Sequence, residues 1–397
     1  MRRMLMKSYV SASVFVFVLL MGSLACNNAY IVPPLSPSSV ATPTSTSTNN
    51  VVATATRTNT PSASWQIVGN PGLGYGLGQF TSLAVNGSTL YVVSADTNNQ
   101  GMLFTYNGSN WVTVGNDDFS TAEADYPSVA FYNNTPYVAY SDNDNTSDRK
   151  ATVMKFTGGN WVPVGSPGFT SNYAFYTSLA FSGSTPYVAY QDYYSGSEAT
   201  VMMYNGSNWV TVGNPDFSAG AAQNITLVIN NNVPYVAYSD GGNNNKATVM
   251  TYNGASWVPV GSAGFSTGAA ENPSMVFYNN MPYMVYGDGA NGGKATVVTY
   301  NGSSWVPVGN EDFSAGATGC MAIAFNGSTP YVAFEDVANG NKGTAMMLNG
   351  SGWVNVGSPG FSSGQADTMS LAFIGSTLYV AFEDQANNFD STVMSYH

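Results

Sequence analysis

The amino-acid sequence predicts an all-β fold, a seven-bladed β-propeller with four-stranded antiparallel blades. Seven tryptophans recur at intervals of 46, 50 and then 48 residues, and each begins the pattern W-x-x-V-G. Every repeat contains four short β-rich runs, and no segment of the repeat region has sustained helical periodicity. A unit of about 48 residues with four strands is the size of a propeller blade. The tryptophans are Trp65, Trp111, Trp161, Trp209, Trp257, Trp305 and Trp353.

One repeat shows the four predicted strands clearly. Residues 274–309 contain the runs SMVF, PYMVY, KATVVTY and WVPVG, which we name strands A, B, C and D. All four are rich in β-branched and aromatic residues, which favour strands. Asn279-Asn280 separates strands A and B, and Asn301-Gly302 separates strands C and D. Both pairs are typical of two-residue hairpin turns.

The two ends of the repeat region predict how the ring closes. The region begins with an isolated D strand at Trp65 and ends with a C strand, residues 391–396. The last blade therefore lacks its own D strand. We expect the Trp65 strand to pair with the last blade, because this hides two open sheet edges that would otherwise promote aggregation. The predicted propeller spans residues 65–397.

The segments before the propeller predict export. Residues 1–25 resemble a signal peptide, with basic residues Arg2, Arg3 and Lys7, an apolar run at 14–21, and small residues before Cys26. The apolar run is too short for a membrane span. Cys26 resembles the lipidated cysteine of bacterial lipoproteins, although Ser23 stands where leucine is usual. We expect an extracytoplasmic protein whose membrane contact is a lipid anchor on Cys26, and secretion without the anchor is the alternative.

Residues 26–64 are rich in Ser, Thr and Pro and carry a single charge, Arg57. Such a composition cannot bury enough apolar surface to offset the entropy cost of ordering. We expect a disordered stalk between the anchor and the propeller.

Composition excludes several classes of function. The chain has 22 acidic and 10 basic residues among 397, with a formal charge of −12. A nucleic-acid partner is not expected, because neutralising phosphates needs clustered Lys and Arg. The single histidine, His397, excludes histidine-based zinc sites and hydrolytic triads. We expect no cofactor apart from a potential Ca²⁺ ion, and a monomer.

All 22 acidic residues are predicted to lie on one face of the propeller. They fall in the D–A loops or in the B–C connections, whereas the A–B and C–D turns are Asn, Gly, Ser and Thr. One aspartate recurs before the B–C turn of every blade. We expect it to accept backbone N–H bonds or to pair with the repeated lysine, and a ring of cation or sugar ligands is the alternative. These residues are Asp96, Asp142, Asp192, Asp240, Asp288, Asp336 and Asp384.

Candidate ligand-binding residues lie where blades depart from the repeat. The loops of the third blade read SNYAFY and DYYSGSE, and the preceding blade adds a tyrosine. Aromatic rings beside carboxylates suit carbohydrate or peptide binding, because rings give rigid apolar area and acids orient hydroxyls or cations. Loops that simply pack on themselves are the alternative. The candidates are Tyr126, Tyr173, Phe175, Tyr176, Tyr193 and Tyr194.

A group of three aspartates and one cysteine complete the list of candidate residues. Asp142, Asp144 and Asp148 have oxygen ligands at the spacing of a calcium loop, but the run lacks the glycine and closing glutamate of an EF-hand. They form a candidate metal site. Cys320 is expected to be a buried structural thiol.

The repeat resembles the tandem units of secreted bacterial β-propeller proteins and, more distantly, kelch and sialidase-type propellers. This resemblance covers residue 65 to the end and implies a fold rather than a chemistry. We expect a non-catalytic binding or adhesion module with a carbohydrate or surface-protein ligand. One alternative is a glycan-active hydrolase with paired carboxylates, for which Glu335 and Glu383 are the candidates. A sialidase is disfavoured because Arg149 is the only arginine in the repeat region. A purely structural surface protein is the third alternative.

Overall fold

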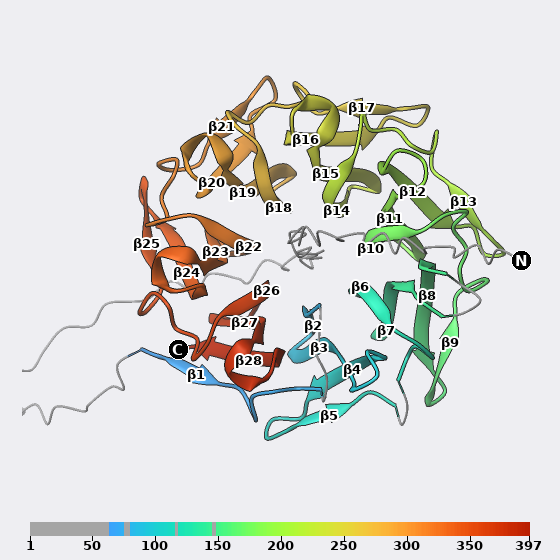
Figure 1. Cartoon of the computed structure of the whole chain (residues 1–397), viewed down its shortest axis with the longest axis horizontal. Helices are drawn as coiled ribbons and strands as arrows, with labels where there is room; N and C mark the ends of the chain where they lie inside the picture. Colours follow the sequence, from blue (N-terminus) through green and yellow to red (C-terminus); the bar gives the residue numbers. More distant parts are fainter. Residues whose placement is uncertain (1–62, 75–79, 116–117, 145–147) are drawn as a thin grey trace, which may run out of the picture.

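The computed structural model describes residues 63–74, 80–115, 118–144 and 148–397. Within these ranges the chain forms seven four-stranded antiparallel sheets that stand around a common axis (Figure 1). The protein is a seven-bladed β-propeller, as its sequence predicts. Residues 1–62, which include the predicted signal peptide, Cys26 and nearly all of the stalk, lie outside the described residues. In the described ranges no helix is both long and apolar enough to cross a membrane.

Strands A and B form the inner half of each blade, with strand A nearest the axis (Figure 1). The A strands are β2 (Ser82–Asn86), β6 (Ala124–Tyr132), β10 (Ala174–Ser182), β14 (Ala222–Asn230), β18 (Ala270–Tyr278), β22 (Thr318–Asn326) and β26 (Ala366–Ile374). The B strands are β3 (Thr89–Ala95), β7 (Thr135–Asp142), β11 (Thr185–Asp192), β15 (Val233–Asp240), β19 (Met281–Asp288), β23 (Thr329–Asp336) and β27 (Thr377–Asp384).

Strands C and D form the outer half. The C strands are β4 (Gly101–Tyr106), β8 (Lys150–Thr157), β12 (Glu198–Tyr204), β16 (Lys246–Tyr252), β20 (Lys294–Tyr300), β24 (Lys342–Asn349) and β28 (Asp390–Tyr396). The D strands are β1 (Trp65–Ile67), β5 (Trp111–Thr113), β9 (Asn160–Pro163), β13 (Trp209–Thr211), β17 (Trp257–Pro259), β21 (Trp305–Pro307) and β25 (Gly352–Asn355). Four 3₁₀ turns follow B strands: η1 (Gly241–Asn243), η2 (Gly289–Asn291), η3 (Val337–Asn339) and η4 (Gln385–Asn387). Blade 1 is β2–β5, and blade 7 is β26–β28 with β1.

The ring closes as predicted. Strand β1 pairs antiparallel with β28, and Trp65 stands opposite Tyr396. The first strand of the propeller thus completes the last blade (Figure 1). This pairing covers the outer edge of β28, which would otherwise present unpaired backbone groups to solvent.

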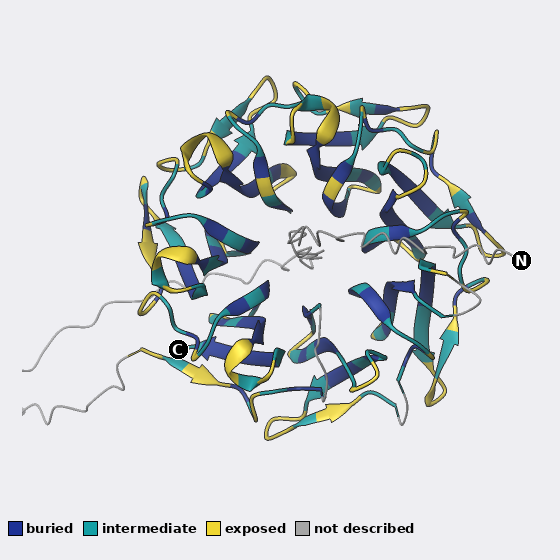
Figure 2. Cartoon of the chain, in the orientation of Figure 1, coloured by how far each residue is buried: buried dark blue, intermediate teal, exposed yellow. Residues whose placement is uncertain are grey.

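The hydrophobic core lies between the blades rather than inside them. One cluster joins Leu179 and Val188 of blade 3 to Ala139 and Val153 of blade 2, and the other clusters likewise combine adjacent blades. The inner strands are buried and the outer D strands are largely exposed (Figure 2). Because a blade buries its apolar face only against its neighbours, the ring is one cooperative unit.

The repeated tryptophans link neighbouring blades. Each indole Nε1 donates a hydrogen bond to the carbonyl of the valine in the W-x-x-V-G pattern of the preceding blade. The distances run from 2.7 to 3.1 Å, and the last bond, from Trp65 to Val356, crosses the closure. A phenylalanine from the D–A loop stacks on most of these rings, as Phe217 does on Trp257 with centroids 4.3 Å apart. The predicted packing role of the tryptophans is confirmed.

The repeated aspartates are structural, as the first interpretation predicts. Asp240 accepts hydrogen bonds from the Gly242 backbone N–H at 3.0 Å, Asn243 Nδ2 at 2.8 Å and Thr248 Oγ1 at 2.8 Å. It thereby caps η1, and Asp288, Asp336 and Asp384 cap η2, η3 and η4 in the same way. Pairing with lysine is not observed: within the described residues, Arg149 makes the only ion pairs.

Candidate functional site

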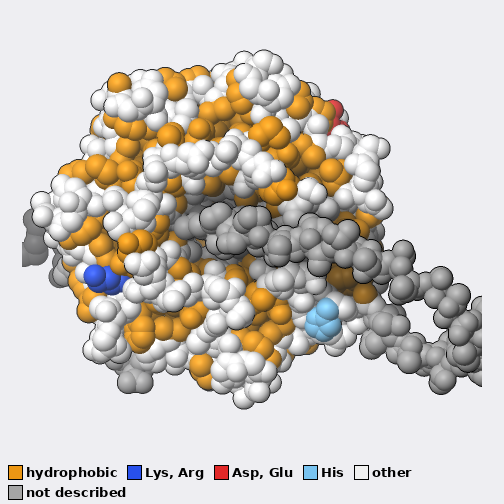
Figure 3. Space-filling model, turned by 180° about the vertical axis from the view of Figure 1, so that it is seen from behind, with side chains coloured by type: hydrophobic (Ala, Val, Ile, Leu, Met, Phe, Trp, Pro, Cys, Tyr) orange, Lys and Arg blue, Asp and Glu red, His pale blue; other side chains and the backbone are white. Residues whose placement is uncertain are grey.

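The two faces of the propeller differ in charge. We call the side that holds the D–A loops (for example 166–173) and the B–C connections (193–197) the loop face, and the opposite side the turn face. The two kinds of loop meet on the loop face, where the Tyr193 N–H donates to the Tyr173 carbonyl at 3.1 Å. His397 ends the last C strand and marks the turn face. Figure 3, in which His397 is visible, shows Asp and Glu only at one edge of that face.

A β-bulge opens the A strand of blades 2 to 7. In β10 the register shifts between Phe175 and Ser178, and Tyr176 adopts a φ of 54°. Tyr126 adopts a φ of 52° at the same position of blade 2. Positive φ is uncommon for a bulky residue and persists only where the surrounding fold imposes it. The bulge re-aims one side chain in each of these blades. By repeat position, these side chains are Tyr126, Tyr176, Asn224, Asn272, Cys320 and Thr368, and Phe80 occupies the same repeat position in blade 1.

The six predicted aromatic residues form one connected cluster. Tyr126 contacts Tyr176 and Phe175, with ring centroids 5.0 and 5.7 Å apart. Phe175 contacts Tyr193 at 5.2 Å. The rings of Tyr193 and Tyr194 are 5.3 Å apart, and Tyr173 lies 4.7 Å from Tyr194.

Phe80 of blade 1 extends this cluster, because its ring lies 4.5 Å from that of Tyr126. Sequence reasoning missed Phe80. The signal that could have found it is its position three residues before Leu83, which matches Tyr176 before Leu179. We call the seven residues the aromatic arc: Phe80, Tyr126, Tyr173, Phe175, Tyr176, Tyr193 and Tyr194.

The outer end of the arc faces solvent. Tyr193 is 48% and Tyr194 is 62% exposed, whereas the other five rings are partly buried. The Tyr173 hydroxyl is hydrogen-bonded to Tyr194 and to Asp148, and these bonds raise the pKa of Tyr173 to about 12. Burial raises the pKa of Tyr126 well above its usual range. Both hydroxyls therefore stay protonated at physiological pH and can donate hydrogen bonds.

Polar groups flank the arc. Asn172 Nδ2 donates to Asp192 Oδ1 at 2.9 Å beside the two exposed tyrosines. Arg149 binds Asp125 Oδ2 at 2.7 Å and lies 3.5 Å from Glu123 Oε2. Burial and the neighbouring Glu123 charge raise the pKa of Asp125 to about 6, although Arg149 opposes the shift.

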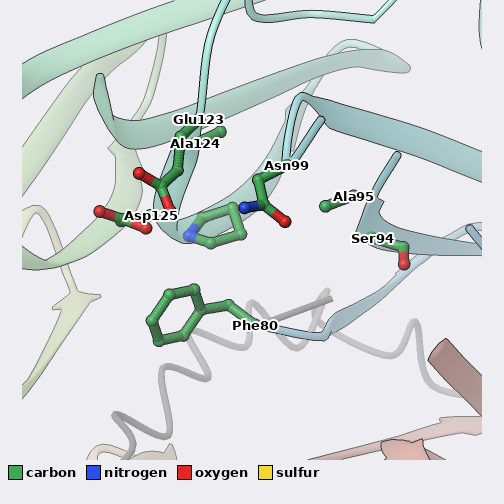
Figure 4. A pocket seen from close by; sticks show the side chains of 8 residues that line it. Phe80, Ser94, Ala95, Asn99, Glu123, Ala124 and Asp125 are labelled. Atoms are coloured by element: carbon green, nitrogen blue, oxygen red, sulfur yellow. The ribbon is translucent and has the colours of Figure 1, made fainter. Parts of the chain in front are cut away.

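A small hollow lies where the arc meets blades 1 and 2. Phe80 lies on one side of it, and Asp125, Glu123 and Asn99 lie across from Phe80 (Figure 4). Ser94 lines the hollow at a position where the other blades carry a buried Tyr or Phe. The hollow has room for about one water molecule, so it can seat a single polar group rather than a whole ligand.

A groove lies on the turn face, between blades 3 and 4. It has a volume of about 580 Å³ and is lined by Tyr187, Met203, Pro234 and Tyr252, with Asn232 on its rim. No sequence argument pointed to it. The lining is made of repeated positions, so no departure from the repeat pattern marks this groove.

Two of the three candidate calcium residues are hydrogen-bonded to other side chains. Residues 145–147 of the run lie outside the described residues. Asp142 accepts a hydrogen bond from Thr152 Oγ1 at 3.0 Å, and Asp148 is bound to Tyr173. Among the residues that the structure describes, no three of His, Cys, Asp or Glu group as metal ligands.

The paired glutamates of the hydrolase alternative are joined by a third acid. Asp367 stands opposite Glu383 in the β26–β27 ladder, and its charge also acts on Glu335 of the neighbouring blade. Burial, with the Asp367 charge, raises the pKa of Glu335 to about 7. Glu383 is only 3% exposed, and burial raises its pKa well above the usual range. The acid that can share a substrate with Glu335 is therefore Asp367 and not Glu383.

Cys320 is buried, at 4% exposure, as predicted. No other blade carries a cysteine at this position. The other cysteine of the chain, Cys26, lies outside the described residues.

Comparison with known proteins identifies the fold and no family. No protein-family model and no curated protein sequence matches the chain. The described similarity to secreted bacterial repeat proteins thus has no support at the sequence level beyond the propeller fold itself.

Solved structures that are similar to this chain include β-propeller lectins and a sialidase. The SapL1 lectin, solved in complex with alpha methyl fucoside, is 14% identical with a TM-score of 0.50, over 70% of this chain and 96% of that chain. The lectin of Aleuria aurantia, described as six-bladed, is 16% identical with a TM-score of 0.45, over 70% and 92%. Trypanosoma rangeli sialidase is 12% identical with a TM-score of 0.45, over 85% of this chain and 59% of that chain. At these identities the likeness establishes the fold alone.

Proposed function

We propose that this protein is a non-catalytic carbohydrate-binding propeller whose binding site lies on the loop face of blades 2 and 3. One observation supports the proposal above the others. Tyr193 and Tyr194 are 48% and 62% exposed, and Tyr173 holds them in one cluster. Large aromatic side chains are seldom left in solvent together unless a ligand covers them.

The surroundings of these tyrosines suit sugars. Aromatic faces stack on the C–H faces of pyranose rings, and the exposed carboxylate of Asp148 with the partly exposed amide of Asn172 can bind hydroxyls. The architecture shared with the SapL1 lectin, solved with alpha methyl fucoside, adds support. A surface-protein ligand is the competing outcome of the test.

The test is a glycan array of the purified protein, followed by calorimetry with the best glycan. We expect Tyr193→Ala and Tyr194→Ala each to lower the affinity at least tenfold. Val337→Ala is the matched control, because Val337 occupies the Tyr193 position in blade 6 and is 49% exposed. The proposal fails if no glycan binds, or if Tyr187→Ala on the turn face abolishes binding while the loop-face variants do not.

The hydrolase alternative keeps one specific observation in its favour. Glu335 has a pKa raised to about 7 and lies beside Asp367. A carboxylic acid that stays protonated near neutral pH beside a second carboxylate is the arrangement of glycosidase acids. Hydrolysis of a glycan found on the array, lost in both Glu335→Gln and Asp367→Asn, would establish this function in place of simple binding.

We further propose that residues 1–25 direct export and that Cys26 carries a lipid anchor. The chain has two cysteines, so lipidation of Cys26 and a disulfide between Cys26 and Cys320 exclude each other. Mass spectrometry of the protein from its native membrane distinguishes them. A lipid increment on the peptide that begins at Cys26 supports the anchor, and a peptide that links both cysteines contradicts it.

Two smaller proposals complete this assignment. Ca²⁺ binding at Asp142, Asp144 and Asp148 is tested by calorimetry with calcium chloride, and the Asp144→Asn and Asp148→Asn variants should lose any heat of binding.

The protein is proposed to be a monomer, which light scattering after size-exclusion chromatography measures directly.

A further inference from the structure

We infer that the aromatic arc binds an extended carbohydrate chain of several units, neutral or amine-bearing, and not a single sugar. This inference rests on the proposed function and deepens it. The chain would enter at Tyr194 on the outer loops of blade 3 and end at Phe80, beside the hollow between blades 1 and 2.

The arc is continuous from the outer loops to the axis. Tyr194 and Tyr173 lie on the loops of blade 3, and Tyr193 leads to Phe175 at the start of β10. From there the contacts cross to Tyr126 of blade 2, and the last step, to Phe80 of blade 1, is 4.5 Å. Pyranose and phenyl rings are of comparable size, so successive rings can each cover one sugar unit. A monosaccharide would leave most of this surface unused.

The inner half of the arc is a rigid platform. Tyr126 and Tyr176 sit in β-bulges at positive φ, and their rings are partly buried against each other, 5.0 Å apart. Side chains that are already ordered lose little conformational entropy when a ligand binds. The inner rings can therefore add affinity for each sugar unit that reaches them.

The remaining blades offer no comparable platform. The residues at the same repeat position in blades 4 to 7 are Asn224, Asn272, Cys320 and Thr368. Asn224 Nδ2 donates to Asn272 Oδ1 at 3.3 Å, so these two amides satisfy each other in part. Stacking subsites are thus confined to blades 1 to 3, which gives the bound chain a defined path across one sector.

Charge around the arc restricts the class of sugar. Glu123, Asp125, Asp148 and Asp192 flank the arc. Arg149 is the only arginine of the repeat region, and it is already held by Asp125 and Glu123. In the loops of blades 2 and 3 the acidic side chains outnumber the two basic ones, Arg149 and Lys150, so the carboxylates of sialic acids and uronic acids would be repelled. Hydroxyl and ammonium groups, in contrast, can donate hydrogen bonds to the exposed carboxylate of Asp148 and the partly exposed carboxylate of Glu123.

The experiment is calorimetry of the whole protein with ladders of one to six units: cello-oligosaccharides, N-acetylchito-oligosaccharides and their deacetylated forms. We expect the affinity to rise at least tenfold between one and four units in one of these ladders. Polyuronate oligomers of equal length should bind at least tenfold more weakly at low salt.

Variants locate the subsites along the arc. Phe80→Ala and Tyr126→Ala should lower the affinity for four units about five- to tenfold and leave that for two units unchanged, whereas Tyr194→Ala should lower both. Phe80→Leu keeps the apolar volume but not the ring, and it serves where the alanine variant does not fold. Circular dichroism checks the fold of each variant.

The outcomes separate this inference from the proposed function. Glycan binding that depends on Tyr193 and Tyr194 but has equal affinity for one and four units would overturn the extended chain and leave the proposed function intact. A rise with length that Phe80→Ala and Tyr126→Ala do not change would also overturn the path. No binding of any glycan would overturn both.

Discussion

Blades 3 and 4 share their strands, their tryptophan and their capping aspartate, but they differ in their loops. In blade 4 the B–C turn is Gly241-Gly242-Asn243, wound into η1. A Cβ at Gly242 would lie 2.6 Å from the backbone of Ala219, so the loops close tightly on each other. In blade 3 the same positions are Tyr193 and Tyr194, which cannot fit there and turn toward solvent.

This difference shows where the fold tolerates change. The strand and tryptophan positions are fixed by contacts with both neighbouring blades, and every blade must satisfy them. The loop positions contact mainly each other, so one blade can exchange small residues for aromatic ones without disturbing the ring. We therefore expect repeated positions to control stability and the departures of blade 3 to control binding.

The largest expected effect comes from opening the ring. A chain that begins at residue 70 lacks β1, and with it the Trp65–Val356 hydrogen bond and the stacking of Trp65 on Phe361 at 4.0 Å. We expect thermal unfolding to shift down by about 10 °C or more, because the last blade loses an edge strand and interblade packing. A chain that begins at residue 63 is the control. Equal melting temperatures would show that closure contributes nothing.

A second substitution tests the repeated scaffold of blades 3 and 4. Gly213 has a φ of 73°, and a Cβ there would lie 2.7 Å from Tyr252 of the next blade. Gly213→Ala should lower the free energy of unfolding by about 2–4 kcal/mol, through strain and steric clash together. Gly206→Ala is matched, since Gly206 has a φ of 97° but open space around it. It should cost about 1 kcal/mol in urea unfolding. Equal costs would mean that the interblade contact is not tight.

The acids of blades 6 and 7 give a smaller effect that depends on pH. The pKa of Glu335 is about 7 in the folded protein, above its ordinary value, so the folded state holds this proton more tightly than the unfolded chain. Stability should rise as the pH falls from 8 toward 5. Burial gives Asp367 and Glu383 shifts of the same sign.

Scanning calorimetry at pH 5 and pH 8 measures the dependence. Glu335→Gln should reduce the difference in melting temperature by a few degrees, and Glu311→Gln, which removes an exposed acid from a nearby loop, should not. A protein that is more stable at pH 8 would contradict the assignment of raised pKa values.

The smallest effect on stability is expected at the departures of blade 3. The double variant Tyr193→Ala/Tyr194→Ala should change the melting temperature by about 1 °C or less, because both rings are largely exposed. The same variant should abolish glycan binding. A large loss of stability would instead mean that these tyrosines serve to hold the loops together.

The sequence predicted the structural features that recur, because each is repeated in every blade and depends on near neighbours. The blade count, the closure by Trp65 and the capping role of Asp240 could all be read from position within the repeat. The grouping of Tyr173 with Tyr193 and Tyr194 could also be predicted, since both loops belong to one blade and lie on one face.

The features that only the tertiary structure decided are contacts between side chains of neighbouring blades. Phe80 joins Tyr126 through a contact across an interface, and Asp367 comes between Glu335 and Glu383 in the same way. The turn-face groove was likewise not predicted. The sequence by itself determined the ring, because periodic side chains dictate periodic packing. It could not determine which unlike side chains meet, because such contacts depend on the bulges and on the distance between two sheets that no repeat encodes.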